Sequence, residues 1–399
     1  MMSNFEYGTP EGSEELKLLG AVVAQCFVGS PEEEEKYLNL IGLENIRTLR
    51  QGNQIAGGLG TIPMSQWWGE KKVSMTGIGA VAIAPEYRGG GVAVSLMQET
   101  IKELYTQGVS TSVLYPAVQR LYRKVGYEQA GSRFVWEVPT NSLDIRKELS
   151  NQVLPLVSIS PGENKEEKKL RELYSQQAQS INGHLERHNF NWHKIVKPSN
   201  VENTYAYLFG SSDKPEGYVI FYQHEENNTL FLNILDWIVL TPAAAYTFWN
   251  LVRNHSSQIG KLRWRSSSID LLTLLLPQQN AKVIVPERWM LRIVNVVQAL
   301  SERGYPRNLE TELHLQVEDD LIPENNGKFI LAVKDGCGKV TKGGKGKIKL
   351  DIKSLATLYS GLFSAYQLQI LGKLSAPLPV INDANQIFTG TTPWMRDFF

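Results

Sequence analysis

The chain has 399 residues, of which 42% are hydrophobic and 21% charged, with 41 basic and 41 acidic side chains. This length is more than one hydrophobic core normally serves, so we expect two or three globular domains. The balanced charge gives no reason to expect nucleic acid or an anionic membrane surface as a partner. We find no leader pattern, no apolar run of membrane-spanning length and only two cysteines, so we expect a soluble cytoplasmic protein.

The N-terminal part predicts two helices followed by a hairpin. Apolar spacing and turn residues place helices over 14–27 and 31–40, and strands over 46–50 and 54–60. The second helix opens with the acidic run Glu32–Glu35, which is typical of a solvated first turn but could also attract a cationic substrate. Trp67 and Trp68 lie in Met64–Gly69, which we interpret as a flap, although tryptophans more often pack in cores.

A strand, a glycine-rich turn and a helix follow, and they organise the first part of the chain. The apolar run Val81–Ile83 ends just before Pro85, and the run Arg88–Ala93 (RGGGVA) precedes a helical pattern that extends to Leu104. A helix N-terminus presents unpaired N–H groups to an anion, and glycines let a phosphate approach the backbone. The dinucleotide fingerprint and the P-loop both fail to match. The alternative to an anion-binding loop is an ordinary glycine-rich turn between a strand and a helix.

The next segment predicts a strand over 109–115, a short helix over 118–124 and a strand over 133–138. Residues 140–170 are polar, contain Pro155 and Pro161, and include the charged run Glu163–Lys169. We interpret this stretch as a domain boundary whose charged run merges into a helix.

The middle third repeats the first part in a degraded form. Strands are predicted over 216–222 and 229–240, a helix over 243–254 and a strand over 261–265. Ile238–Pro242 mirrors Val81–Pro85, but Ala243–Tyr246 follows with neither arginine nor glycine. We therefore infer a second copy of the fold that cannot bring a phosphate to its backbone.

The pattern changes at Trp289. The run Trp289–Val294 leads into a helix that ends at Gly304. Later strands are predicted over 313–317, 327–334 and 348–352, helices over 353–359 and 364–372, and then a loop-rich tail. This mixture predicts an α+β domain. Gly336–Lys349 is rich in glycine and lysine but has no Ser/Thr after a Gly-Lys pair, so we favour a solvated hairpin loop over a P-loop.

Three features together resemble a known family. Arg88-x-x-Gly91-x-Ala93 resembles the pyrophosphate loop of the GCN5-related N-acetyltransferases, Leu121–Tyr127 resembles their aromatic-x-x-x-Gly-Phe/Tyr stretch, and the part beginning Trp289–Arg292 resembles the sterol carrier protein fold. The whole chain thus resembles the Eis (enhanced intracellular survival) family of aminoglycoside N-acetyltransferases. The resemblance implies tandem acetyltransferase folds, α/β in character, and a C-terminal α+β domain. The implied domains are 1–148 with the loop, 149–288 without it, and 289–399.

The resemblance also implies the chemistry: acetyl transfer from acetyl-CoA to amines, including several positions of aminoglycosides, by a homohexamer without a metal. Residues 74–80 contain no carboxylate or histidine, although attack of an amine needs a proton acceptor. In the family the base is the C-terminal carboxylate, here that of Phe399, and the acid is a tyrosine, here Tyr122. The residues implied to bind acetyl-CoA are Val81, Ala82, Ile83, Arg88, Gly89, Gly90, Gly91, Val92 and Ala93.

By position, the implied substrate residues are Cys26, Phe27, Trp67, Asp397 and the run Glu32–Glu35. Cys26 stands where the family often has an acid, and it could equally be a packed helix residue. His184 and His188 have i, i+4 spacing near His193, yet Leu185 replaces the glutamate of a zinc motif, so we favour surface histidines over a metal site.

Three functions stay open on the sequence. The first is amine N-acetylation with aminoglycosides as substrates. The second keeps the reaction but takes a protein lysine or a small metabolic amine as the substrate. The third is a non-catalytic lipid- or ligand-binding protein, which the intact loop at Arg88–Ala93 disfavours.

Overall fold

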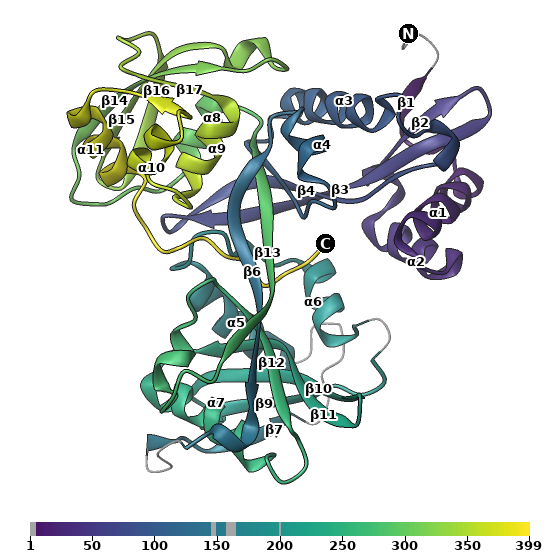
Figure 1. Ribbon diagram of the computed structural model, residues 1–399, viewed down its shortest axis with the longest axis vertical. Helices are drawn as coiled ribbons and strands as arrows, with labels where there is room; N and C mark the ends of the chain where they lie inside the picture. Colours follow the sequence, from purple (N-terminus) through teal and green to yellow (C-terminus); the bar gives the residue numbers. More distant parts are fainter. Residues whose placement is uncertain (1–4, 145–148, 157–164, 199–200) are drawn as a thin grey trace. The chain divides into compact units, whose positions relative to one another are not determined.

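The computed structural model describes residues 5–144, 149–156, 165–198 and 201–399. These residues form two compact units (Figure 1). The first comprises the chain up to residue 130, together with 289–391 and 398–399; the second comprises 131–288 and 392–397. The last eight residues of the sequence are therefore divided between the two units.

The first unit begins with a mixed sheet flanked by helices. Its first elements are β1 (Glu6–Gly8), α1 (Ser13–Phe27), α2 (Pro31–Ile41), β2 (Ile46–Gln51), β3 (Gln54–Trp68), β4 (Lys71–Ile83), α3 (Val92–Thr106), β5 (Thr111–Leu114) and α4 (Gln119–Arg123). The strand order in this unit is β1-β2-β3-β4-β5-β13, where β13 is Lys282–Ile293 and belongs to this unit from Trp289 on. Strands β4 and β5 are parallel. Helix α3 covers one face of the sheet, and α1 and α2 lie on the other (Figure 1).

Local chemistry explains the start of α2. Ser30 caps the helix by accepting a hydrogen bond from the Glu33 amide at 3.2 Å, and Pro31 occupies the first turn, where its missing N–H costs nothing. The acidic residues of that turn face the positive end of the helix dipole. Gly42 ends the helix with φ 94°, a left-handed conformation that glycine adopts readily.

The expected flap over Met64–Gly69 is wrong. Up to Trp68 these residues continue β3 and pair with β4, with Trp67 opposite Lys72. Trp68 is fully buried, and its ring meets the rings of Trp289 and Tyr359 edge to face at 6.2 and 5.5 Å. The alternative reading, that these tryptophans belong to the core, is confirmed.

The second unit repeats the strand–helix–strand arrangement. Its elements are β6 (Glu128–Pro139), β7 (Val153–Leu156), α5 (Lys165–Ala178), β8 (Leu185–Glu186), α6 (Asn189–Val196), β9 (Tyr205–Gly210), β10 (Pro215–Glu226), β11 (Thr229–Val239), α7 (Pro242–Asn254) and β12 (Lys261–Ser266). The strand order is β6-β12-β11-β10-β9-β7, and β11 and β12 are parallel on either side of α7, as β4 and β5 are around α3. The predicted internal repeat is therefore confirmed.

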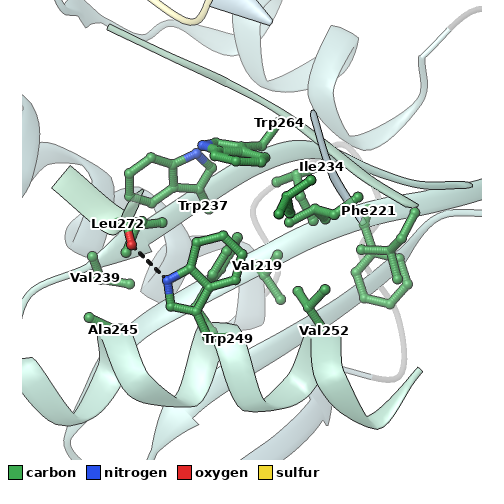
Figure 2. Packing of buried hydrophobic residues seen from close by; sticks show 14 of the residues in the cluster. Val219, Phe221, Ile234, Trp237, Val239, Ala245, Trp249, Val252, Trp264 and Leu272 are labelled. Carbon is green, nitrogen blue, oxygen red and sulfur yellow. Dashed lines mark hydrogen bonds between the residues drawn. The ribbon is translucent and has the colours of Figure 1, made fainter. Parts of the chain in front are cut away.

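Helix α7 packs one apolar face onto this second sheet. Ala245, Trp249 and Val252 project from the helix toward buried residues of the strands, and the Trp249 indole donates a hydrogen bond to the Leu272 carbonyl at 2.9 Å (Figure 2). The buried indole thus keeps a polar partner while its rings exclude water. Within 140–170, which we interpreted as a domain boundary, Val153–Leu156 forms β7, whereas 145–148 and 157–164 lie outside the described residues.

The remaining elements belong to the first unit. They are α8 (Val296–Glu302), β14 (Thr311–Glu318), β15 (Gly327–Lys334), β16 (Cys337–Lys342), β17 (Ile348–Asp351), α9 (Ile352–Ser360), α10 (Ala365–Ile370), β18 (Leu374–Ser375) and α11 (Leu378–Ile387). Five strands form a second sheet in the order β16-β15-β14-β17-β18. The predicted α+β character is confirmed.

Two expectations in this part need correction. The tail was expected to be loop-rich, but Leu378–Ile387 is a helix whose buried Val380, Ile381, Ala384 and Ile387 show helical spacing. The stretch Gly336–Lys349 was expected to be a hairpin loop, but Cys337–Lys342 forms a strand paired with β15. Among the described helices, none is long and apolar enough to cross a membrane.

Candidate active site

Strand β5 ends before β4 does and leaves one edge of β4 open. Their parallel pairing runs from Met75 opposite Thr111 to Ile78 opposite Leu114, where β5 ends. Strand β4 continues to Ile83 and keeps its other neighbour, β3. Beyond Ile78, the β5 side of the β4 backbone therefore has no ladder partner among the described residues. An open strand edge of this kind can pair with the amides of an extended ligand.

A β-bulge lies at the start of the open edge. Gly60 pairs with Gly79 and Gly58 with Ala82, so two residues of β4, Ala80 and Val81, stand opposite one residue of β3. Ala80 has φ 52°, a left-handed conformation that is uncommon for a residue with a Cβ atom. Bulges bend a strand and redirect its side chains, and they are frequent beside active sites.

The glycine-rich turn after β4 is exposed and leads directly into α3. Gly89 and Gly91 have φ 83° and 84°, and Gly91 is the N-cap of α3 without a side-chain capping bond. A Cβ atom added at Gly89 or Gly90 would meet nothing within 4 Å. The backbone of the turn is therefore open to a ligand, and the first N–H groups of a long helix face the same space.

Arg88 is held by two neighbours. Its Nε donates to the Ile83 carbonyl at 3.0 Å, and its Nη2 lies 3.1 Å from the Cys26 sulfur at the end of α1. The Cys26 thiol is also 3.6 Å from the Ile83 carbonyl. Cys26 therefore supports the arginine of the turn, a role that spacing along the chain could not show.

Tyr122 lies in the core between the turn and β5. It belongs to the same buried cluster as Ile83, Val92 and Leu114, and its ring meets Tyr127 edge to face at 6.1 Å. Burial raises the pKa of the Tyr122 hydroxyl to about 12, so the group keeps its proton at neutral pH. Its hydroxyl makes no hydrogen bond to any other residue that the structure describes, so the proton is available to a ligand.

Phe399 ends against the middle of β4. The residue is 5% exposed, and its ring lies 5.9 Å from the ring of Tyr115, centroid to centroid. A Cβ atom at Gly77 would lie 2.6 Å from the Phe399 ring, and one at Gly79 would lie 3.3 Å from its carboxyl carbon. Glycine at these two positions leaves the room that the last residue occupies.

Sequence reasoning missed Tyr37. Its hydroxyl would lie 3.0 Å from the same Cβ atom at Gly79. Burial, with a smaller contribution from the negative charge of Glu34, raises its pKa, so the hydroxyl stays protonated at neutral pH. Tyr37 falls within the α2 pattern that the sequence predicted, but no local signal distinguishes it from any other helical tyrosine.

The structure does not bring all the implied substrate residues together. Phe27 follows Cys26 and is 52% exposed. Trp67 is buried and lies seven strand residues beyond Gly60, about 23 Å along β3. Asp397 belongs to the second unit, where its carboxylate pairs with Arg187 at 2.8 Å. Glu32 and Glu33 are exposed in the first turn of α2, and Glu34 and Glu35 are half-buried.

In the second unit, the N-terminus of α7, which corresponds to that of α3, is capped by a side chain. Thr241 caps α7 by accepting a hydrogen bond from the Ala244 amide at 3.1 Å, and its hydroxyl donates to the Glu216 carboxylate at 2.6 Å. The helix end that could face an anion thus already has a capping side chain and a negative charge beside it. This agrees with the absence of glycine and arginine after Pro242.

The histidines do not form a metal site. No group of three or more His, Cys, Asp or Glu side chains is placed to hold a metal ion in the described part of the chain. The expectation of surface histidines is wrong for His184, which is fully buried with its ring parallel to that of Tyr174. Burial holds the pKa of His184 well below its usual value, so the ring is neutral.

Known families match most of the chain. Residues 12–130 and 183–293 each match the acetyltransferase (GNAT) domain, and residues 296–396 match the sterol carrier protein domain. The crystal structure of a GCN5-related N-acetyltransferase from Anabaena variabilis is similar, with 50% sequence identity, a TM-score of 0.94, and coverage of 99% of this chain and 100% of that one.

Two curated relatives show the same relationship. An N-acetyltransferase of Streptomyces griseus, described as uncharacterized, is 26% identical over 355 residues, which are 83% of each chain. N-acetyltransferase Eis of Mycobacterium tuberculosis is 23% identical over 376 residues, which are 90% of this chain and 89% of that one.

The fold, the open strand edge and the glycine-rich turn define a GCN5-related N-acetyltransferase, a class of enzymes that uses acetyl-CoA. The chain belongs to this family. Its two acetyltransferase domains are followed by a sterol carrier protein domain, and it is similar to N-acetyltransferase Eis over 90% of its length. The family resemblance and the fold class inferred from the sequence are confirmed. The implied domain boundaries and site residues stay predictions.

Proposed function

We propose that the enzyme transfers the acetyl group of acetyl-CoA to primary amines of cationic polyamine substrates such as aminoglycosides. Acetyl transfer itself follows from the family; the substrate class and the residue roles are the proposal. The observation that carries it is the position of Phe399, whose carboxyl group lies over Gly79 at the start of the open edge of β4.

The residues of the first domain fit acetyl-CoA. We propose that Arg88 and the turn Gly89–Val92 hold the pyrophosphate, because the turn is exposed, free of Cβ atoms and followed by an uncapped helix end. The β4 backbone at Val81–Ile83 would pair with the extended part of the ligand. Bound acetyl-CoA supplies the thioester that is attacked. The capped end of α7 supports a single acetyl-CoA site for each chain.

Two groups of this chain would move protons. The α-carboxylate of Phe399 is proposed to accept the proton of the attacking amine, directly or through one water molecule. Tyr122 holds a proton at its hydroxyl because burial raises its pKa to about 12, and it would give that proton to the departing thiolate. Tyr37, protonated beside Gly79, would donate a hydrogen bond that keeps the carboxylate oriented.

The acidic side chains near α1 and α2 support a cationic substrate. Glu32 and Glu33 are exposed, and Phe27 offers an exposed aromatic surface close by in sequence. Negative charge at the mouth of a site concentrates cations. Trp67 and Asp397 do not enter this proposal, because the first lies far along β3 and the second is buried in an ion pair.

The test measures thiol release from acetyl-CoA with kanamycin and, separately, with a lysine peptide. The untagged chain, Tyr122→Phe and a chain lacking Phe399 are compared, and acetyl-CoA binding is measured by calorimetry. We expect turnover on kanamycin that falls at least about 100-fold in both variants, since general acid or base catalysis contributes on this order. Binding of acetyl-CoA should be nearly unchanged.

Other results of this test would favour a different substrate class or contradict the role of Phe399. A higher kcat/KM for the peptide would make a protein lysine or a small metabolic amine the substrate class. Full turnover without Phe399 would refute the role of its carboxylate. A hexameric assembly, which the family resemblance implies, is a separate proposal that the mass of the protein in solution tests.

A further inference from the structure

The C-terminal tail is bound by the second unit along its backbone. Four hydrogen bonds hold four consecutive tail residues: Ser132 N to Pro393 O at 3.1 Å, Trp394 N to Asn182 O at 3.1 Å, Met395 N to Ser132 O at 3.0 Å, and Arg133 Nε to Arg396 O at 3.1 Å. The tail thus pairs with β6 on one side and with the loop before β8 on the other. A bound peptide that extends a sheet edge makes contacts of this kind.

Two tail side chains enter a buried cluster of four charges. Arg396 Nη1 lies 2.7 Å from Asp236 Oδ1, and Asp397 Oδ1 lies 2.8 Å from Arg187 Nε. Arg187 also pairs with Asp236, at 2.5 Å. Each of the four side chains is at most 5% exposed, and their charges sum to zero. Buried ions stabilise a structure only as a complete set, since removing one leaves its partner charged and unpaired.

The tail also inserts an aromatic side chain. Trp394 meets the ring of His184 edge to face at 4.5 Å and stacks with Trp237 at 6.4 Å. Arg396 lies over the Trp237 ring, 4.7 Å from its centroid. Because His184 is buried and neutral, it presents an uncharged aromatic surface to the indole. The pocket for Trp394 is therefore aromatic on two sides.

We propose that the second acetyltransferase-like unit, which lacks the anion-binding turn, serves as the holder of the C-terminal tail and so positions Phe399. Asp397 is the last anchored residue. Phe399 is two residues beyond Asp397, so the two lie at most about 7 Å apart along an extended chain. Arg187 and Asp236 are then positioning residues for the α-carboxylate. The catalytic consequence rests on the proposed role of Phe399 as the base, whereas the docking itself does not.

The test separates docking from catalysis. Carboxypeptidase A releases C-terminal phenylalanine only from an accessible tail, and mass spectrometry follows the loss of Phe399 from the full chain. Asp397→Asn and Arg187→Gln each remove one charge of the cluster. Arg263→Gln is the matched control, because it removes an arginine paired with Glu137 and Glu226 in the same unit and away from the tail.

We expect release of Phe399 to be at least about tenfold faster in both cluster variants and unchanged in the control, because an incomplete buried cluster loosens the tail. Turnover should fall in the same variants with KM for acetyl-CoA unchanged. Asp397→Asn leaves Arg187 paired with Asp236, so it decides the question if Arg187→Gln fails to fold.

An unchanged release rate in folded Asp397→Asn would overturn the holder proposal. Faster release without loss of turnover would support the docking and overturn the base assignment of Phe399. The two proposals therefore fail in different readouts.

Discussion

The carboxyl group of Phe399 and the hydroxyl of Tyr37 meet over the same residue, Gly79. A Cβ atom there would lie 3.0 Å from the hydroxyl and 3.3 Å from the carboxyl carbon. Three parts of the sequence, a helix near the N-terminus, a central strand and the last residue, thus converge at one point. The strand bulge that follows at Ala80 begins the open edge of β4.

Gly79→Ala should lower turnover while leaving acetyl-CoA binding nearly intact. The added methyl group would enter the space between Tyr37 and Phe399 and move the carboxylate by a few tenths of an ångström. A misplaced catalytic group can cost about 10- to 100-fold in kcat. Steady-state kinetics and calorimetry measure the two effects. Gly20→Ala on α1 is the control, because its Cβ would make only ordinary contacts, at 3.5 Å or more, with Glu35 of α2. Unchanged kcat in Gly79→Ala would contradict the proposed site.

Gly90→Ala should weaken acetyl-CoA binding without changing the stability of the free protein. The new Cβ meets nothing within 4 Å, and Gly90 has no positive φ, so the fold should accept it. If a pyrophosphate occupies this space, the methyl group will block it. We expect an increase in Kd of about tenfold, or 1.4 kcal/mol. Calorimetry gives Kd, and thermal unfolding without ligand is the control; an unchanged Kd would place the pyrophosphate elsewhere.

Gly126→Ala should destabilise the first unit. Gly126 has φ 90°, and an added Cβ would lie 2.7 Å from the guanidinium of Arg292, which is fully buried and paired with Asp319. Left-handed strain and overpacking should each cost about 1–3 kcal/mol. Gly108→Ala shares the positive φ, but its nearest neighbour is 3.9 Å away. The difference in melting temperature between the two variants measures the collision, and equal values would argue against it.

Lys194→Met should stabilise the protein below pH 8 and have little effect above pH 10. Burial on α6 lowers the pKa of Lys194 to about 8, with Asp397 opposing this and Arg133 adding to it. Between pH 8 and the ordinary pKa of lysine, the unfolded chain therefore binds more protons than the folded chain. The free energy of unfolding rises with pH across that window, and this gain is absent below pH 8. The effect is at most about 3 kcal/mol. Melting temperatures at pH 7 and pH 10 test it; a gain at pH 10 equal to that at pH 7 would contradict the titration.

The elements around the candidate site could be predicted because their signals are local. Helical spacing located α1, α2 and α3, and the apolar run and glycines located the end of β4 and the turn after it. The internal repeat was visible because β11 and α7 follow the same order as β4 and α3. The missing glycines after Pro242 correctly predicted that the second helix end differs.

Other features could not be predicted because their causes lie far apart in the sequence. The flap over Met64–Gly69 was wrong, since only the pairing with β4 shows that β3 continues to Trp68. Tyr37 has no local signal, and its importance comes from its neighbours over Gly79. Asp397 was interpreted as a substrate residue, but its carboxylate is buried against Arg187.

By itself, the sequence determined the chain's class, its repeated architecture and the position of its glycine-rich turn, because these depend on spacing and residue type within short windows. Only the tertiary structure decided which groups meet at the site and what holds the tail. A buried charge needs partners, and those partners can come from any part of the chain. For Arg396 and Asp397 they are Asp236 and Arg187, which no local pattern connects to them.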